Sequence, residues 1–560
     1  MSDNSLKKGR YTRHSNKIGL YSTSQDRIGF LSNNNDVVLS FPFKDAVLEA
    51  GMSKEDSGRE ERFLHQEIDG KDIDTLFEPK ALTNFEYFSK VGDTVQKKTP
   101  TKSEIEFFDE NGELQQNLLI KGNNLLALHS LSSKLAGKVK LIYIDPPYNT
   151  GNDGFKYNDN FNHSSWLIFM KNRLEIAKAL LSDDGVIFVQ CDDNEQAYLK
   201  VLMDDIFGRD CFIANFIWKK KGTSTNVEGV QVSQLCDFIL AYSKTKRSVI
   251  KPRMKNSSDR SYPLSDSEGN FRLVVIEKKN TGEYQRDTMQ FNILDTPPRD
   301  GKRWQIGEVK ARELEAKNRF TLGDDGVVRL KIYSFEDGDS FSAQPTLLID
   351  NMGSTNDGNK QLSSILSENN FNNPKPEELM HHLIKITTNE NDIVLDYHLG
   401  SGTTCAVAHK MGRRWIGIEQ MDYIEDITKA RLLKVLEGEQ GGISKSVDWQ
   451  GGGSFVYFEL KKYNQDFLNQ IMAANSKGEL DEVYADMAKN AFLKFWFDKN
   501  EFEKDENFRS LDLDQRKELL ISILDENQLY LNHADMRDSR YHVSEEEMNL
   551  TDLFYGAKND

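Results

Sequence analysis

The sequence predicts an α/β fold built around a mostly parallel β-sheet. Short apolar runs alternate with longer stretches in which apolar residues recur at helical spacing, which is the order of strand–helix–strand units. Turn signals such as Asp183-Asp184-Gly185 separate successive elements. With 560 residues, the chain is long enough for about three or four folded units.

The alternating pattern occupies two separate parts of the chain. In the first part, the run from Lys140 to Ile144 is apolar on both faces, as in a strand that is buried between helices. The pattern is lost after Trp218 and returns near Asp392. The expected strands are 118–121, 140–144, 186–190, 393–396 and 415–419, and the expected helices are 124–135, 166–181, 195–207 and 403–411. We therefore expect one domain that is split in sequence, followed beyond about residue 462 by charged helices.

The composition excludes several classes of protein. Hydrophobic residues make up 38% of the chain and charged residues 29%, as in a soluble protein with a substantial core. No stretch approaches the roughly 18 consecutive apolar residues of a membrane span, and the first residues lack the apolar run of a signal peptide. The four cysteines are far apart and the ten histidines form no cluster, which argues against a disulfide scaffold and a metal site. We expect a cytoplasmic protein without a membrane partner or a metal.

The charge of the chain is unevenly distributed. The net charge of −17 would by itself argue against nucleic acid as a partner. From Trp218 to Phe320, however, there are 21 Lys and Arg and only 13 Asp and Glu, a net charge of +8, whereas residues 461–560 carry a net charge of −9. A basic segment inside an acidic protein is expected where one module contacts phosphates, although a solvated lysine-rich surface explains the charge equally well.

The first chemical motif, Asp145-Pro146-Pro147-Tyr148, directly follows the expected strand 140–144. Open α/β sheets bind ligands at the carboxyl ends of their strands. The two prolines fix the backbone and remove two N–H donors, so the Pro146 carbonyl and the Asp145 carboxylate are available as acceptors beside the flat ring of Tyr148. This set suits a planar substrate with an exocyclic amino group, and a plain turn after a core strand is the alternative.

The second motif runs from Asp396 to Thr404, between an expected strand and an expected helix. Glycines at 400 and 402 allow a ligand to approach the backbone closely at a helix N-terminus. Glu419 ends the next expected strand, where a carboxylate usually binds ribose hydroxyls. Because a third glycine and a Walker lysine are both missing, the motif predicts a nucleoside-containing cofactor other than a dinucleotide or ATP.

Together the two motifs resemble those of amino-methyltransferases that use S-adenosyl-L-methionine. The DPPY motif precedes the cofactor motif and a basic insert separates them, as in the β class of DNA methyltransferases. More closely, the segments LSFPFKDAVLEAG, LIKGNNLLALHSL, KVKLIYIDPPYNTGNDGFKYNDNF, GVIFVQCDDNEQAYL and ENQLYLNHADM resemble the Mod subunit of type III restriction–modification systems. The resemblance covers nearly the whole chain apart from the insert. It implies a Rossmann-like methyltransferase fold with a mostly parallel seven-stranded sheet, an inserted target-recognition domain and a helical C-terminal region.

The resemblance also implies roles for individual residues. Asp145, Pro146, Pro147 and Tyr148 would form the catalytic motif, and Asp rather than Ser at 145 favours adenine over cytosine. The residues that would hold S-adenosyl-L-methionine are Asn123, Lys375, Asp396, His398, Gly400, Ser401, Gly402, Thr403, Thr404 and Glu419. This sequence departs from the commoner pattern at His398, where Phe is usual, and at Asn123, where Asp is frequent. Candidates for the pocket of a flipped base, with core packing as the alternative, are Phe155, Tyr157 and Phe161.

The domain boundaries implied by the resemblance are an N-terminal region at 1–100, the two methyltransferase halves at 101–218 and 366–461, a target-recognition domain at 219–365 and a dimerisation region at 462–560. In and beside the target-recognition domain, basic side chains are candidates for contacts with phosphates or guanines. These candidates are Lys219, Lys220, Lys221, Lys246, Arg247, Arg253, Lys278 and Arg303.

The implied function is methylation of adenine N6 in double-stranded DNA, by a homodimer in the cytoplasm, associated with the nucleoid. A Res subunit with helicase and nuclease activity is the implied partner, because the 560 residues contain no GxxxxGK[ST] motif that would serve ATP-driven cleavage. Two alternatives stay open. One is a solitary DNA methyltransferase that acts on adenine N6 or cytosine N4, and the other is a non-catalytic DNA-binding specificity module.

Overall fold

The computed structural model describes residues 76–150, 163–223, 232–246, 250–255, 260–338, 340–366, 371–494, 497–502, 511–525 and 529–556. Nearer the N-terminus it describes two antiparallel strand pairs: β1 (Tyr21–Ser22) with β2 (Gly29–Phe30), and β3 (Ala46–Leu48) with β4 (Phe63–His65). The chain forms two compact units. The larger comprises residues 1–250 and 345–560, and the smaller comprises residues 251–344.

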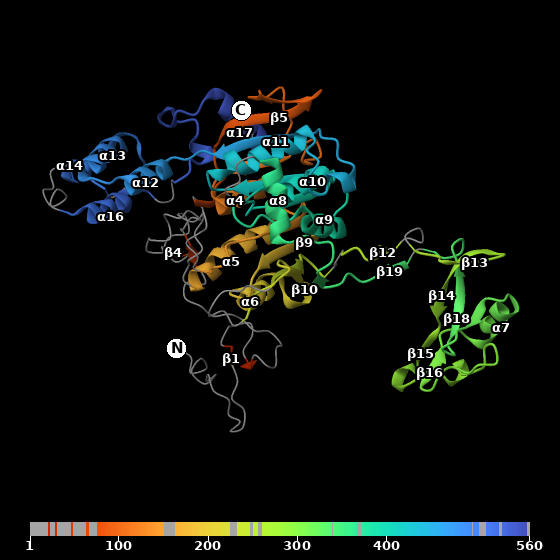
Figure 1. Ribbon diagram of the computed structural model, residues 1–560. Helices are drawn as coiled ribbons and strands as arrows, with labels where there is room; N and C mark the ends of the chain where they lie inside the picture. Colours follow the sequence, from red (N-terminus) through yellow and green to blue (C-terminus); the bar gives the residue numbers. More distant parts are fainter. Residues whose placement is uncertain are drawn as a thin grey trace, which may run out of the picture. The chain divides into compact units, whose positions relative to one another are not determined.

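The larger unit is built on one mixed sheet of eleven strands (Figure 1). Its order is β20 (Leu347–Leu348), β10 (Phe212–Lys219), β11 (Cys236–Ser243), β9 (Leu181–Cys191), β8 (Val139–Ile144), β21 (Ile393–Asp396), β22 (Arg414–Glu419), β7 (Leu118–Lys121), β23 (Ser454–Leu460), β5 (Leu82–Val91) and β6 (Thr94–Lys98). From β9 to β23 all neighbouring strands are parallel, whereas β11, β10, β5 and β6 add antiparallel pairs. The sheet is thus mostly parallel, as predicted, but larger than the expected seven strands.

Helices cover both faces of this sheet, which explains why the side chains of β8 from Leu141 to Ile144 are all buried and largely apolar. Ile142 and Ile144 pack into one buried cluster with α4 (Asn124–Leu135), α5 (His163–Leu180) and α6 (Gln196–Phe207). Leu141 and Tyr143 alternate with them and pack into a second buried cluster on the other face. The helices of that second cluster are α9 (Glu377–Thr387), α10 (Thr403–Lys410) and α11 (Ala430–Glu437).

Several predicted elements are confirmed at their predicted bounds. The helix 124–135 and the strands 118–121 and 393–396 have the bounds that the sequence predicts. β9 is longer than expected, because it begins at Leu181 and includes the Asp-Asp-Gly turn signal.

The smaller unit has a separate core. A four-stranded antiparallel sheet has the order β13 (Leu264–Asp266), β14 (Gly269–Val275), β18 (Val328–Tyr333) and β17 (Phe320–Leu322). Two antiparallel pairs and a helix complete it: β12 (Arg253–Lys255) with β19 (Ser340–Ser342), β15 (Glu277–Lys279) with β16 (Lys302–Trp304), and α7 (Glu308–Ala316). Trp304 is fully buried beside Ile293 and Ala311 in this core.

The boundaries of the units differ from those expected from the sequence. The expected target-recognition domain, 219–365, is wider than the compact unit, because β11 pairs with β9 and belongs to the main sheet. The expected N-terminal region, 1–100, contains β5 and β6, which extend the opposite edge of that sheet. In both cases the boundary depends on which strands pair with the main sheet. The charge and polarity of a segment do not show whether its strands pair with that sheet.

The C-terminal residues are mainly helical, as predicted. α12 (Asn464–Ala473), α13 (Lys477–Asn490), α14 (Lys499–Phe502) and α16 (Leu513–Ile523) surround a small core of their own that includes Met487 and Leu520. The last helix, α17 (Glu545–Tyr555), instead joins the main core, and its Thr551 hydroxyl donates a hydrogen bond to the Leu82 carbonyl on β5 at 3.2 Å. Among the described residues, none of the helices combines the length and the apolar character that crossing a membrane requires.

Candidate active site

The two motifs that the sequence singles out lie on neighbouring strands. β8 ends at Ile144, directly before Asp145, and β21 ends at Asp396. β8 and β21 are parallel neighbours in the sheet, so the loops that follow them leave the same edge. This edge is the carboxyl end of the parallel strands, where open α/β sheets bind their ligands.

The side chain of Asp145 is held by two other side chains. The Tyr148 hydroxyl donates a hydrogen bond to Asp145 Oδ1 at 2.6 Å. The Lys375 ammonium forms an ion pair with Asp145 Oδ2 and lies 5.7 Å from the centre of the Tyr148 ring. The resemblance implies a cofactor role for Lys375, which stays a prediction. The structure brings its ammonium to the DPPY motif, 230 positions away in the chain.

The DPPY loop is stabilised by hydrogen bonds to residues on two other segments of the chain. The indole N–H of Trp166 donates to the Pro147 carbonyl at 2.8 Å, and both prolines are buried. Asn149 adopts a left-handed conformation with φ of 58°, and its amide donates to Glu195 at 2.9 Å. These contacts fix the turn that presents Asp145 and Tyr148. The candidate base-pocket residues Phe155, Tyr157 and Phe161 lie outside the described residues.

A second carboxylate lies beside Tyr148, and the sequence analysis did not identify it. Asp237 on β11 is buried, and its Oδ2 lies 3.3 Å from the Tyr148 hydroxyl. Lys220 forms an ion pair with Asp237 Oδ1 at 2.6 Å. Lys220 was expected to contact DNA, and in the structure its ammonium is paired with Asp237 beside Tyr148. Its contact with DNA stays a prediction. The available signal was the charge of Asp237 within the apolar run Asp237-Phe238-Ile239-Leu240, since buried carboxylates require partners.

The glycine loop after β21 requires glycine at two positions. Gly400 and Gly402 have φ values of 54° and 81°, and Gly402 is the N-cap of α10. A Cβ atom at Gly400 would lie 3.0 Å from the ring of Phe371, and one at Gly402 would lie 3.0 Å from Thr428. The loop therefore brings bare backbone to the N-terminus of α10, which suits the close approach of a ligand.

Asp396 and Glu419 are both buried carboxylates at strand ends. Asp396 accepts hydrogen bonds from the His398 amide at 3.0 Å and the Thr404 hydroxyl at 2.7 Å. Burial, together with the charges of Asp145 and Glu419, raises the pKa of Asp396 to about 7. Glu419 accepts from the backbone amides of Gly400 at 2.9 Å, Gln420 at 2.8 Å and Met421 at 3.1 Å. Burial also raises the pKa of Glu419.

His398 is buried beside these carboxylates. The centre of its ring lies 5.1 Å from that of Tyr397 and 5.8 Å from that of Phe169. Burial, with a further contribution from the charge of Arg173, lowers its pKa well below the ordinary value, so the imidazole is neutral. Neither ring nitrogen has a hydrogen-bond partner within the described part of the chain. A buried, unsatisfied imidazole at the ligand edge is consistent with a position that a bound molecule completes.

Asn123 has a structural role at the start of α4. Its side-chain oxygen accepts from the amides of Leu125 at 3.0 Å and Leu126 at 3.4 Å, as in an N-cap. The contact with the cofactor that the resemblance implies for Asn123 stays a prediction.

A buried ionic cluster lies behind the glycine loop and was also missed by the sequence analysis. Glu377, at the start of α9, is fully buried and binds Lys410 at 2.8 Å and Arg431 at 2.9 Å. Arg431 donates to the Thr403 hydroxyl at 2.7 Å, and that hydroxyl donates to the Lys375 carbonyl at 3.2 Å. Burial of paired charges of this kind needs near-complete hydrogen bonding. The cluster therefore connects the glycine loop to the segment that carries Lys375.

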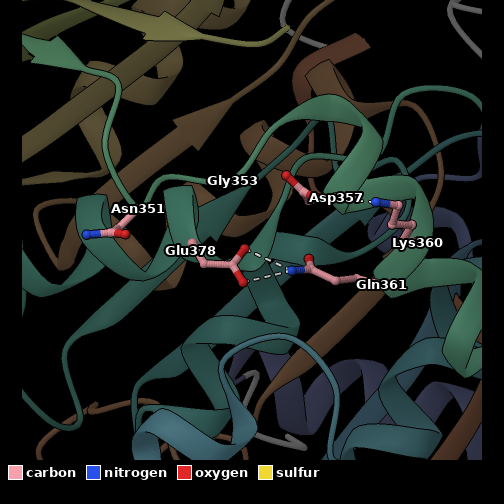
Figure 2. A pocket seen from close by; sticks show the side chains of 6 residues that line it. All are labelled: Asn351, Gly353, Asp357, Lys360, Gln361 and Glu378. Carbon is pink, nitrogen blue, oxygen red and sulfur yellow. Dashed lines mark hydrogen bonds and ion pairs between the residues drawn. The ribbon is translucent and has the colours of Figure 1, made fainter. Parts of the chain in front are cut away.

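An open hollow beside the start of α9 is a different feature. It is lined by Asn351, Gly353, Asp357, Lys360, Gln361 and Glu378 (Figure 2). The Gln361 amide donates to both oxygens of Glu378, at 2.9 and 2.8 Å, and so ties α8 (Thr355–Ile365) to α9. No predicted catalytic or cofactor residue lines this hollow, so the candidate active site is the strand edge and not the hollow.

The remaining candidate DNA contacts are distributed over both units. Lys219 and Lys221 are exposed in the larger unit, where Lys246 is paired with Asp210. Arg253 and Lys278 are exposed in the smaller unit, whereas Arg303 is half-buried and donates to the Trp304 carbonyl at 3.0 Å. Arg247 lies outside the described residues. Contacts of these side chains with DNA stay predictions.

Comparisons with known proteins show the family to which this chain is similar. The profile of the N6_N4_Mtase family, described as DNA methylase, matches residues 139–430. The Haemophilus influenzae protein named Probable type III restriction-modification enzyme HindVI Mod subunit is 37% identical over 670 residues, with 98% of this chain and 88% of the relative covered. The Salmonella typhimurium StyLTI Mod subunit is 34% identical over 329 residues, with 51% of this chain and 49% of the relative covered. Among solved structures, the PvuII DNA methyltransferase, described as cytosine-N4-specific, matches at 15% identity with a TM-score of 0.34, covering 60% of this chain and 92% of its own.

Proposed function

This chain belongs to the N6/N4 family of DNA methylases and, within it, to the Mod subunits of type III restriction–modification enzymes. From this premise we propose that it transfers a methyl group from S-adenosyl-L-methionine to N6 of adenine in duplex DNA. The observation that carries the proposal is the position of the two motifs at the ends of the neighbouring strands β8 and β21. A methyl donor at the glycine loop and an amino group at the DPPY loop would then lie side by side.

The residues at the β21 edge fit S-adenosyl-L-methionine. Gly400 has a left-handed φ of 54° that other residues rarely adopt, and the His398 ring nitrogens are unsatisfied within the described residues. Glu419 would bind the ribose hydroxyls, and Asp396 with the backbone of Gly400 to Thr403 would hold the rest of the cofactor. When bound, S-adenosyl-L-methionine supplies a methyl group on a positively charged sulfur.

The residues of the DPPY loop would orient the acceptor. The target adenine must leave the base stack, which costs a few kcal/mol, and Tyr148 would then stack on its ring. Asp145 and the Pro146 carbonyl would accept the two amino hydrogens and turn the nitrogen lone pair toward the methyl carbon. The new N–C bond forms as the C–S bond breaks and its electron pair stays on sulfur. Because positive charge develops on N6, both acceptors stabilise the transition state, and Asp145 would pass the released proton to solvent.

The proposal gives the other parts of the chain supporting functions. The smaller unit, with its own core and its exposed Arg253 and Lys278, would read the DNA sequence. The helical C-terminal residues would contribute to a homodimer, and a Res subunit would supply ATP-driven cleavage. These activities place the protein in the cytoplasm together with its DNA substrate.

The test is to map methylated bases in host DNA with and without this protein. We expect N6-methyladenine at one recognition sequence only when the protein is present. Product analysis of the same DNA distinguishes N6-methyladenine from N4-methylcytosine. Methylation confined to cytosine, or no protein-dependent methylation, would contradict the proposal.

A further inference from the structure

The hydroxyl of Tyr148 lies between two carboxylates. It is 2.6 Å from Asp145 Oδ1 and 3.3 Å from Asp237 Oδ2. A phenol has one proton, so it donates a full hydrogen bond to only one of them at a time. The shorter distance shows that Asp145 receives this proton in the structure, and Asp237 is the neighbouring alternative acceptor.

Asp237 is anchored much more firmly than Asp145. The side chain of Asp237 is 3% exposed and that of Asp145 is 27% exposed. The Gln190 amide donates to Asp237 Oδ2 at 3.0 Å, while Lys220 binds Oδ1 at 2.6 Å. Gln190 is itself oriented by the Tyr143 hydroxyl, which donates to Gln190 Oε1 at 2.7 Å. A buried carboxylate that binds an amide and an ammonium group is fixed in place.

Both oxygens of Asp145 also have donors. Oδ1 binds the Tyr148 hydroxyl and Oδ2 binds the Lys375 ammonium. An incoming amino group needs a strong acceptor at the same carboxylate, and a short hydrogen bond from Tyr148 competes with it for the charge on Oδ1. Asp145 is therefore a stronger acceptor for the substrate when Tyr148 donates its proton elsewhere.

We propose that Asp237 is a positioning residue which takes over the Tyr148 hydroxyl when the target base enters, and thereby frees Asp145 Oδ1 for the amino group. This inference rests on the proposed function. The exchange requires a rotation about the phenolic C–O bond and a small approach of the two groups, so the ring of Tyr148 keeps its place for stacking. No covalent bond changes in this step.

The surroundings of the phenol support this exchange. Burial and the charges of Asp145 and Asp237 raise the pKa of Tyr148 well above its ordinary value. The hydroxyl therefore keeps its proton and remains a donor throughout the working pH range. Lys220 compensates the charge of Asp237, which explains why a lysine that follows β10 is directed to the active site and away from solvent.

A double-mutant cycle tests the proposal, because Asp237 should act only through the Tyr148 hydroxyl. The variants are Asp237→Asn, Tyr148→Phe and the combination of both. The measured quantities are the single-turnover rate of methyl transfer to genomic DNA from cells that lack the protein, and the Kd of S-adenosyl-L-methionine. We expect Asp237→Asn to lower the rate about tenfold, the effect of losing one charged hydrogen bond, and to leave the Kd within about twofold. In the Tyr148→Phe background, the same substitution should change the rate less than about twofold.

A matched control removes a buried carboxylate elsewhere. Asp552 on α17 is also 2% exposed and binds His533 at 2.7 Å and Arg537 at 2.5 Å. Asp552→Asn should lower the melting temperature without lowering the rate of methyl transfer. If Asp237→Asn does not fold, Asp237→Ser removes the same charge with a smaller polar side chain and completes the same cycle.

Equal rate losses from Asp237→Asn in both Tyr148 backgrounds would overturn the proposal, and so would an unchanged rate. A loss of cofactor affinity as large as the loss of rate would also overturn it, because it would show a general structural effect. These outcomes require a wild-type protein that methylates DNA. A wild-type protein that transfers no methyl group overturns the proposed function itself, and this inference with it.

Discussion

Glu419 and Asp145, at the two ends of the candidate active site, are held by different kinds of donor. At the cofactor end, Glu419 accepts three hydrogen bonds from backbone amides. At the base end, Asp145 is held by the side chains of Tyr148 and Lys375. Backbone donors are fixed by the strand and the loop that carry them, whereas side-chain donors rotate.

This difference indicates that the two ends bind their ligands differently. The cofactor end would be preformed, since the amides that Glu419 accepts from belong to the loops after β21 and β22. At the base end, a substrate amino group would compete with the two side-chain donors of Asp145. The comparison predicts that substitutions at the base end change the rate of the reaction, while substitutions at the cofactor end change affinity.

The largest effect is expected from Asp145→Ala. It removes the acceptor at the atom where positive charge develops, so we expect a loss of methyl-transfer rate of at least about 1,000-fold. The Kd of S-adenosyl-L-methionine, measured by calorimetry, should stay within about twofold, because Glu419 and the glycine loop are untouched. Equal losses of rate and cofactor affinity would refute the division between the two ends.

Glu419→Ala should produce the opposite pattern. It removes a buried carboxylate and leaves three backbone amides without their acceptor, so we expect the Kd of S-adenosyl-L-methionine to rise about 100-fold. The rate at saturating cofactor should fall less than about threefold. Glu419→Gln keeps one acceptor oxygen and should lose less affinity. A reduced rate with an unchanged Kd would contradict the assignment.

The pH dependence of cofactor binding should report Asp396. Its pKa is raised to about 7 by burial and by two neighbouring carboxylates. Only the ionised form attracts the positively charged cofactor, so lowering the pH from 8 to 6 should raise the Kd about tenfold. The folding stability of the cofactor-free protein should depend on pH in the opposite direction to cofactor affinity. Because the folded-state pKa lies above the ordinary value, this group adds stability as the pH falls from 7 toward 4.

Calorimetric titrations and thermal melts between pH 4 and 8 measure the two opposite trends. Asp396→Asn has no proton to gain in this range, so the contribution of this group to both trends should disappear. A wild-type Kd that is independent of pH would show that Asp396 does not face the cofactor.

The smallest effect is expected from a residue of the smaller unit, which belongs to neither end of the candidate active site. Lys278→Ala should weaken DNA binding a few-fold and reduce the slope of log K against log salt concentration by about one, if Lys278 contacts a phosphate. The methyl-transfer rate at saturating DNA should be unchanged. As a control, Lys97→Ala removes an exposed lysine of the larger unit that is paired with Glu86 at 2.5 Å, and should leave the salt slope unchanged. Equal slopes for wild type and Lys278→Ala would remove this residue from the DNA interface.

Much of the fold and part of the site follow from local patterns. The strand ending at Ile144 and the helix 124–135 are as predicted, because their apolar spacing is set by near neighbours in sequence. The number of strands could not be predicted, since β5, β6, β10 and β11 join the sheet through backbone pairing with distant segments. Lys220 illustrates the limit of a charge count, because its partner Asp237 is reached only across the pairing of β10 with β11.

The sequence alone determined the expected chemistry of this protein: the DPPY acceptors and the glycine loop are short motifs that follow strands, and Glu419 ends the next strand. Only the tertiary structure decided how those groups are held. It brings Lys375 and Asp237 to Asp145 and Tyr148 from segments 230 and 89 positions away. The physical reason is that a strand determines where its own loop leaves the sheet, whereas ion pairs and hydrogen bonds between loops depend on the order in which strands pair.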